Sequence, residues 1–105
     1  MDRLAMLEKI VAAKPDDPFP RYGLAMEYKK LGRHDEAVRA FEELTRVHPS
    51  YVPAYLMFGN LLEALGRAEQ AAEVYGRGIE AARAADNDHA LGELQSARDG
   101  LLRLE

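Results

Sequence analysis

The sequence has no cysteine and very little serine. Serine occurs only at positions 50 and 96 of the 105 residues, and neither lies in a nucleophile-elbow motif. The lack of cysteine excludes disulfides, thiol nucleophiles and thiolate zinc sites, and it fits a reducing compartment. Covalent catalysis through cysteine or serine therefore has no support in the sequence.

Long apolar runs and an excess of basic charge are also missing. No stretch approaches the ~18 unbroken apolar residues that a membrane span needs, and residues 1–10 mix charged with apolar side chains, unlike a signal peptide. The 14 basic and 18 acidic residues give a net charge of −4, whereas phosphate binding needs a concentrated basic face. We expect a soluble, cytoplasmic protein that binds neither membrane nor nucleic acid.

Motifs for metals, phosphates and cofactors are absent as well. The adjacent His-Asp-Glu at 34–36 lacks the i, i+4 histidine pair of a zinc helix. The segment DNDHALG at 86–92 lacks the ligand spacing of a calcium loop, and its first three residues are predicted to cap a helix. Gly76 and Gly78 are not followed by the Lys-Ser/Thr of a phosphate loop. We predict no metal, no cofactor and no catalytic residue.

An internal repeat is the strongest feature that is present. Leu-Gly-Arg occurs at 31–33 and again at 65–67, which is 34 residues later. Repeats of this length indicate stacked supersecondary units. Other pairs at the same offset keep the residue type or its size: Pro15 and Pro49, Ala37 and Ala71, Phe41 and Tyr75.

Each repeat is predicted to be a pair of antiparallel helices. Asp17 can cap a helix that begins at Pro18, because a missing N–H costs nothing at the first helical position. Gly32 can adopt the left-handed backbone of a helix C-cap, and a second helix then runs to Pro49. A connection this short makes the two helices antiparallel. The second repeat follows the same plan with helices at about 53–65 and 68–85 on either side of Gly66.

Small and aromatic residues are expected to supply the packing. On the first helix Leu24, Tyr28 and Leu31 recur at spacings of 4 and 3 and predict one apolar stripe. Small side chains let helix axes approach, and aromatic ones fill the space between helices. The small residues are Ala25, Ala37, Gly59 and Ala71, and the aromatic ones are Phe41, Phe58 and Tyr75.

Both ends of the chain are predicted to be partial units. Residues 3–14 align with the second helix of a repeat, and a last helix bears leucines at helical spacing as far as Leu104. We predict a single domain, 1–105, divided into an N-terminal lone helix (1–16), repeat one (17–50), repeat two (51–85) and a C-terminal capping helix (86–105).

Each unit has large apolar, small and glycine residues in a similar order. The first, 18–51, has Leu24, Ala25, Tyr28, Gly32, Ala37, Phe41 and Pro49; the second, 52–85, has Tyr55, Phe58, Gly59, Leu62, Gly66, Ala71 and Tyr75. This pattern resembles the tetratricopeptide repeat (TPR), although Arg21 and Arg83 replace a preferred aromatic and a closing proline. The resemblance implies an all-α fold, a right-handed superhelix of antiparallel helix pairs with about six helices.

The resemblance also implies a binding surface. In the family the first helix of each pair lines a concave groove that holds a peptide or helical segment of a partner protein. Transfer of the family's contact positions gives eight candidate peptide-binding residues: Phe19, Tyr22, Met26, Lys29, Lys30, Leu56, Asn60 and Glu63. Some members hold a chaperone's C-terminal carboxylate, but Tyr22 and Met57 stand where that clamp wants Lys and Asn, so we predict against this ligand.

Several of these positions have a second interpretation. The N-terminal helix, 3–14, could pack across some of Phe19, Tyr22, Met26 and Leu56 and leave them unavailable to a ligand. Lys29 and Lys30 could attract an acidic partner segment, but two lysines at a helix C-terminus also favour the helix dipole. Asn60 could bond the backbone of a peptide or simply face water.

The sequence thus predicts a non-catalytic interaction module that binds a protein or peptide and acts as a scaffold. The alternative is a self-association module, a homodimer in which Met6, Leu7, Ile10 and Val11 pack against a second copy. An enzyme would need polar side chains that converge in a pocket, and no such cluster is evident.

Overall fold

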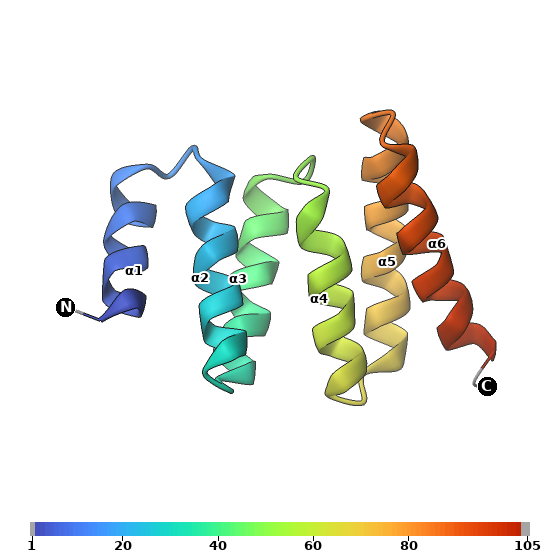
Figure 1. Ribbon diagram of the computed structural model, residues 1–105, viewed down its shortest axis with the longest axis horizontal. Helices are drawn as coiled ribbons and strands as arrows, with labels where there is room; N and C mark the ends of the chain where they lie inside the picture. The colour runs from blue at the N-terminus through green and yellow to red at the C-terminus, as the bar shows by residue number, and fades with distance from the viewer. Residues whose placement is uncertain (1, 104–105) are drawn as a thin grey trace. The chain divides into compact units, whose positions relative to one another are not determined.

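The computed structural model describes residues 2–103, and every regular element in that range is a helix. This confirms the predicted all-α fold (Figure 1). The helices are α1 (Arg3–Ala13), α2 (Pro18–Lys30), α3 (His34–Val47), α4 (Pro53–Ala64), α5 (Ala68–Ala84) and α6 (Asp88–Arg103).

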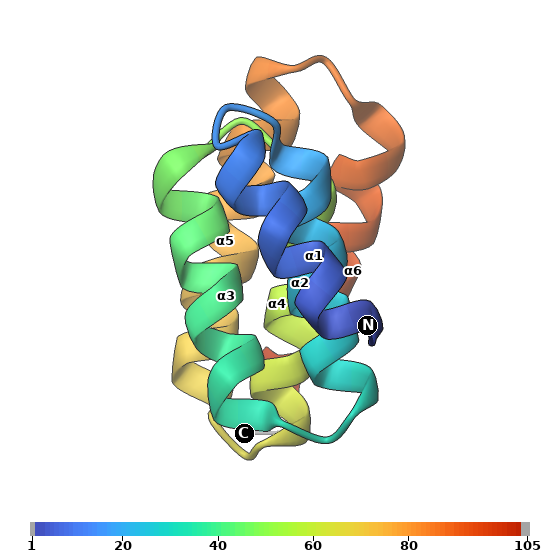
Figure 2. The ribbon, with the colours of Figure 1, turned by 90° about the vertical axis from the view of Figure 1, so that its left-hand side faces the viewer.

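The chain divides into two compact units, residues 1–48 and 49–105. In unit 1, α2 packs against both α1 and α3, and Figure 2 shows α1 in front of α2 with α3 beside it. In unit 2, α5 packs against both α4 and α6, and α4 also contacts α6. Each unit is therefore a three-helix assembly with one central helix.

The predicted ends of α2 are confirmed. The Asp17 carboxylate accepts the backbone N–H of Phe19 at 3.0 Å and caps the helix, with Pro18 at its first position. At the other end Gly32 has a φ of 74°, which is the left-handed conformation expected of a C-cap glycine. The N–H of Arg33 then donates to the carbonyl of Tyr28 at 3.0 Å, which closes the turn.

The turns between α4 and α5 and between α5 and α6 also contain a left-handed residue. Gly66 has a φ of 75°, so this turn of the second repeat has the same left-handed glycine as the turn at Gly32. Before α6 a non-glycine residue, Asp86, takes this role with a φ of 54°. The side chain of Asn87 accepts the N–H of Ala90 at 3.1 Å, which identifies the capping residue among the three candidates at 86–88.

The small and aromatic residues predicted to pack are buried. In unit 1, Ala25, Ala37 and Phe41 have no exposed surface. In unit 2, Ala71 and Tyr75 are equally buried, Phe58 is nearly so, and Gly59 lies under the Tyr75 ring. Leu94 and Leu101 of the last helix are buried too, whereas Leu104 lies outside the described residues.

The prediction of a single apolar stripe along α2 is wrong at the C-terminal end of the helix. Leu31 is 53% exposed, whereas Glu27 is buried. The physical reason is the position of α1, whose first residue, Arg3, pairs with Glu27. Leu31 lies one turn beyond Glu27 at the C-cap of α2, and therefore past the start of α1.

Candidate functional site

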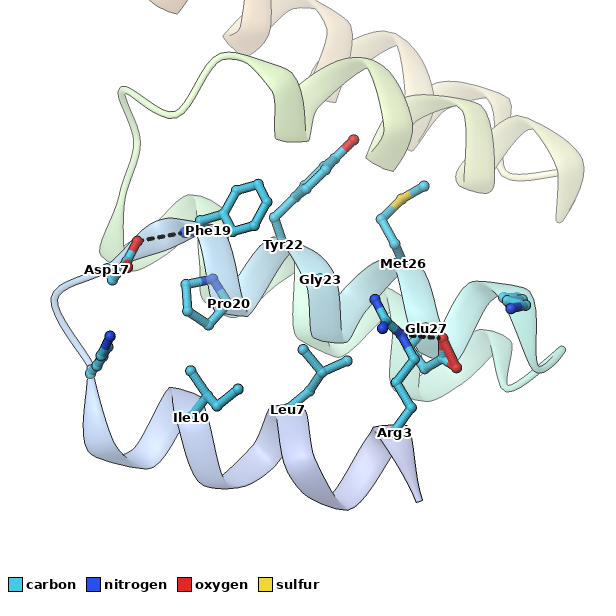
Figure 3. A pocket seen from close by; sticks show the side chains of 12 residues that line it. Arg3, Leu7, Ile10, Asp17, Phe19, Pro20, Tyr22, Gly23, Met26 and Glu27 are labelled. Carbon is cyan, nitrogen blue, oxygen red and sulfur yellow. Dashed lines mark hydrogen bonds and ion pairs between the residues drawn. The ribbon is translucent and has the colours of Figure 1, made fainter. Parts of the chain in front are cut away.

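A groove of about 740 Å³ lies between α1 and α2 in unit 1 (Figure 3). We call it the α1/α2 groove. Phe19, Tyr22 and Met26, spaced by 3 and 4 residues, form a row along α2, while Leu7 and Ile10 point from α1 toward α2. Its complete lining is Arg3, Leu7, Ile10, Lys14, Asp17, Phe19, Pro20, Tyr22, Gly23, Met26, Glu27 and Lys30.

The width of the α1/α2 groove depends on how closely α1 approaches α2. A Cβ atom at Gly23 would lie 3.3 Å from the Cδ2 atom of Leu7, so glycine permits this approach. The contact nevertheless leaves much apolar surface uncovered, because Phe19 is 68% and Ile10 39% exposed. Exposed apolar residues that line one groove are typical of a surface that binds a partner.

An ion pair connects the N-terminal end of α1 to α2. The Nε atom of Arg3 lies 3.2 Å from Oε1 of Glu27, whose side chain is only 10% exposed. A buried carboxylate needs a partner of this kind, since an unpaired buried charge is costly. Residues 24 positions apart give no periodic signal, so the sequence did not predict this pair.

The Tyr22 ring belongs partly to the core and partly to the α1/α2 groove. It meets the buried Phe41 ring edge-on, with ring centroids 6.5 Å apart and an interplanar angle of 67°. Tyr22 and Met26 are each half-buried. The N-terminal helix therefore forms the opposite wall of the groove and does not bury Phe19, Tyr22 or Met26.

The two predicted lysines differ in their placement. Lys30 lines the α1/α2 groove, whereas Lys29 is not among its lining residues. Both lie in the last turn of α2, where a positive charge favours the helix dipole. The position of Lys30 therefore fits both attraction of an acidic partner segment and stabilisation of the helix dipole. The position of Lys29 favours stabilisation of the dipole.

Two candidate residues of the second repeat have a partner inside unit 2. The Tyr75 hydroxyl hydrogen-bonds Oδ1 of Asn60 at 2.7 Å and also Oε2 of Glu63. Burial raises the pKa of the Tyr75 phenol, and the Glu63 carboxylate raises this pKa further. The sequence carries no signal of this network, because its partners lie 12 and 15 positions apart on different helices. A role for Asn60 and Glu63 in peptide binding stays a prediction.

Leu56 lines a smaller groove of about 660 Å³ in unit 2. It is half-buried, and the other lining residues lie on α6. There Nε2 of His89 lies 3.3 Å from Oε1 of Glu93, with Asp88 nearby in the lining. The groove at Leu56 thus has no lysine or arginine in its lining, whereas the α1/α2 groove has Arg3, Lys14 and Lys30 as well as two carboxylates.

The part of the chain that the structure describes has neither a metal site nor a helix suited to a bilayer. Within residues 2–103, no three His, Asp or Glu side chains are grouped so that they could hold a metal ion. In the same range, no helix combines the length and the apolar character that crossing a bilayer requires.

These features define a class of protein built from repeated antiparallel helix pairs with apolar grooves between helices. Residues 22–89 match the sequence model of the tetratricopeptide repeat. The chain therefore belongs to the TPR family, as the 34-residue repeat predicted. TPR domains are generally protein–protein interaction modules, and proteins of the family are generally non-enzymatic scaffolds.

Solved structures agree with this assignment. A TPR domain protein from Salinibacter ruber, determined by NMR, is 42% identical with a TM-score of 0.82, and the match covers 87% of this chain and 92% of that one. A protein from Bordetella parapertussis is 23% identical with a TM-score of 0.79 over 98% of this chain and 90% of that one, which supports the fold alone.

Curated relatives are much longer proteins. The small glutamine-rich tetratricopeptide repeat-containing protein 2 of Mycosarcoma maydis is 28% identical over 72 residues, which are 69% of this chain but 20% of the relative. The TPR repeat-containing thioredoxin TTL4 of Arabidopsis thaliana is 33% identical over 70 residues, 67% of this chain and 10% of the relative. The similarity thus concerns the repeat segment and not the whole of these proteins.

Proposed function

We propose that this TPR chain binds a segment of a partner protein in the α1/α2 groove and holds it without catalysis. The observation that supports this most directly is the exposure of Phe19, at 68%, beside Ile10, Tyr22 and Met26 in one groove. Covering the exposed part of one such phenylalanine would contribute about 1–2 kcal/mol before the costs of association are subtracted. A few side chains of this kind are enough for a specific but weak complex.

The polar groups of the groove support a binding role over a catalytic one. Asp17 accepts the N–H of Phe19, and Glu27 pairs with Arg3, so both carboxylates already have structural partners. Catalysis needs titratable groups that converge on a reacting atom. The α1/α2 groove instead offers an apolar surface with charges at its margins.

The test is capture of a partner by the full chain and by two glutamate variants. Met26→Glu places a charge inside the α1/α2 groove, whereas Met6→Glu makes the same change on α1, where Met6 is 50% exposed and does not line the groove. Proteins retained by the wild-type chain should be lost with Met26→Glu and kept with Met6→Glu, with helicity and melting temperature nearly unchanged in both. Equal retention by all three proteins would reject the groove as the binding surface.

Self-association remains a second candidate because of one observation on α1. The structure describes the whole of this helix, and none of its residues is buried. Sedimentation separates the two functions. A monomer at tens of micromolar removes the homodimer, whereas a dimer that Met6→Glu dissociates would favour it over capture of another protein.

A further inference from the structure

Positive charge is placed at the two ends of the α1/α2 groove. Lys14 follows α1 at its C-cap, beside the connection to α2, and Lys30 is the last residue of α2. Both line the groove. Figure 1 shows that α1 and α2 run antiparallel. Their C-terminal ends, and with them the two lysines, therefore lie at opposite ends of the groove. At 1.5 Å per residue, the stretch of α2 from Phe19 to Lys30 spans about 16 Å.

The other charges of the groove are already engaged inside unit 1. Arg3 and Glu27 pair with each other, and Asp17 caps α2. Among residues 2–103, neither Lys14 nor Lys30 forms an ion pair. The two ammonium groups are therefore available to carboxylates of a ligand that lies along the groove.

The polar side chains that line the α1/α2 groove indicate whether a bound segment is extended or helical. An extended peptide presents N–H and C=O groups that need partners when they are buried, whereas a helix satisfies its own. The twelve lining residues include no Asn, Gln, Ser or Thr that could serve such a backbone. The rows Phe19, Tyr22, Met26 and Leu7, Ile10, Lys14 have the spacing of helical ridges, between which another helix can pack.

We propose that the occupant of the α1/α2 groove is an amphipathic helix of a partner protein, with a carboxylate at each end of its apolar face. This rests on the proposed function, because it specifies the partner of the same groove. A span of about 16 Å corresponds to about eleven helical residues, and positions eleven apart lie within about 20° of each other around a helix. The two carboxylates would therefore stand on the same side as the apolar residues, one near Lys14 and the other near Lys30.

The probe is a fluorescent alanine-based peptide of about 16 residues, with two glutamates eleven positions apart and leucines on the face between them. A matched peptide has glutamine in place of both glutamates, and a third has a central proline that breaks the helix. In anisotropy titrations at low salt, the glutamate peptide should bind the full chain about tenfold more tightly than the glutamine peptide. The proline peptide should bind more weakly than either, and salt should reduce the difference between the first two.

Charge-reversal variants locate the effect on the protein. Lys14→Glu combined with Lys30→Glu should weaken binding of the glutamate peptide about tenfold and leave the glutamine peptide unchanged. Lys9→Glu is the matched control, since Lys9 is exposed on α1 and does not line the groove. It should change either affinity by less than about twofold.

The failures of the inference and of the proposed function are distinguishable. Equal binding of the glutamate and glutamine peptides, lost in both cases with Met26→Glu, would overturn the carboxylate-bearing helix but leave the groove as a binding surface. Tight binding of the proline peptide, or no measurable binding of the glutamate peptide, would overturn it as well. Binding of the glutamate peptide that Met26→Glu does not weaken would instead reject the proposed function.

Discussion

The contact between α1 and α2 in unit 1 differs sharply from the contact between α4 and α5 in unit 2. No residue of α1 is buried, whereas α4 and α5 each have six buried residues. Both contacts include a glycine on the first helix of a repeat, Gly23 in one and Gly59 in the other. The groove that we propose as a binding surface lies at the contact with the less complete packing.

The residue opposite each glycine explains the difference. A Cβ atom at Gly59 would lie 2.1 Å from the ring of Tyr75, so the ring occupies the space that a side chain would need. At Gly23 the opposing group is only the end of the Leu7 side chain, at 3.3 Å. A rigid ring over a glycine leaves no room for a ligand, whereas an aliphatic side chain over a glycine leaves a groove beside it.

The largest expected effect comes from placing the same methyl group at each contact. Gly59→Ala should lower the free energy of unfolding by about 1–3 kcal/mol or more, because the Tyr75 ring must be displaced. Gly23→Ala should change it by less than about 1 kcal/mol, since the Leu7 methyl can move and alanine favours the helix. Urea unfolding monitored by circular dichroism measures both.

Gly92→Ala is the control for helix propensity in this comparison. A Cβ atom there meets no described heavy atom within 4 Å, so the change should stabilise the protein by about 0.5–1 kcal/mol. If Gly59→Ala were no more harmful than Gly23→Ala, the contrast between the two contacts would be wrong.

The Tyr75 hydroxyl gives the next largest effect. Tyr75→Phe retains the ring over Gly59 but removes the hydrogen bonds to Asn60 and Glu63. We expect a loss of about 1 kcal/mol in unfolding free energy. An unfolding free energy equal to that of the wild-type protein would show that the network contributes nothing.

The contribution of the Tyr75 hydroxyl to stability should also be measurable in the wild-type protein at alkaline pH. Because the folded-state pKa of Tyr75 is raised above the ordinary value of about 10, its contribution to stability is fully present below pH 10. It is lost as the pH rises from there toward the folded-state pKa, because the unfolded chain then ionises more readily. At pH 10.5 the loss from this group should be about 0.8 kcal/mol, and unfolding free energies of Tyr75→Phe should fall less steeply.

The ion pair that holds α1 on α2 should have the smallest effect on global stability. Arg3→Ala removes a partner whose side chain is 69% exposed, so water can take its place beside the Glu27 carboxylate, and we expect a loss of about 0.5 kcal/mol. Hydrogen exchange should nevertheless become faster in α1 and stay unchanged in α3, because only the α1 contact is weakened. Lys9→Ala on the outer side of α1 should leave both rates unaltered.

The candidate site was predictable from the sequence only in part. The resemblance to the family identified Phe19, Tyr22, Met26 and Lys30, and the structure places these four in one groove. It gave no indication that α1 supplies the opposite wall through Leu7 and Ile10. The sequence predicted the apolar residues of α1 only as a surface for a second copy, and no local pattern specifies which of them a neighbouring helix covers.

Glu27 and Tyr75 are two core residues whose contacts the sequence likewise did not predict. A glutamate in the middle of a helix is expected in solvent, yet Glu27 is buried because Arg3, 24 positions earlier, reaches it. Tyr75 was expected to fill space, and it does, but its hydroxyl also reaches Asn60 and Glu63 on α4. Both outcomes depend on the separation and rotation of two helices, which apolar periodicity constrains only loosely.

The sequence by itself determined where the helices begin and end, and hence the repeat. The Asp17 cap and the left-handed glycines Gly32 and Gly66 act through backbone bonds that span only a few residues, so local composition is sufficient. Only the tertiary structure decided which side chains stay exposed, and so where a groove forms. That outcome depends on how far apart neighbouring helices lie, and a methyl group or a ring at one contact sets this distance.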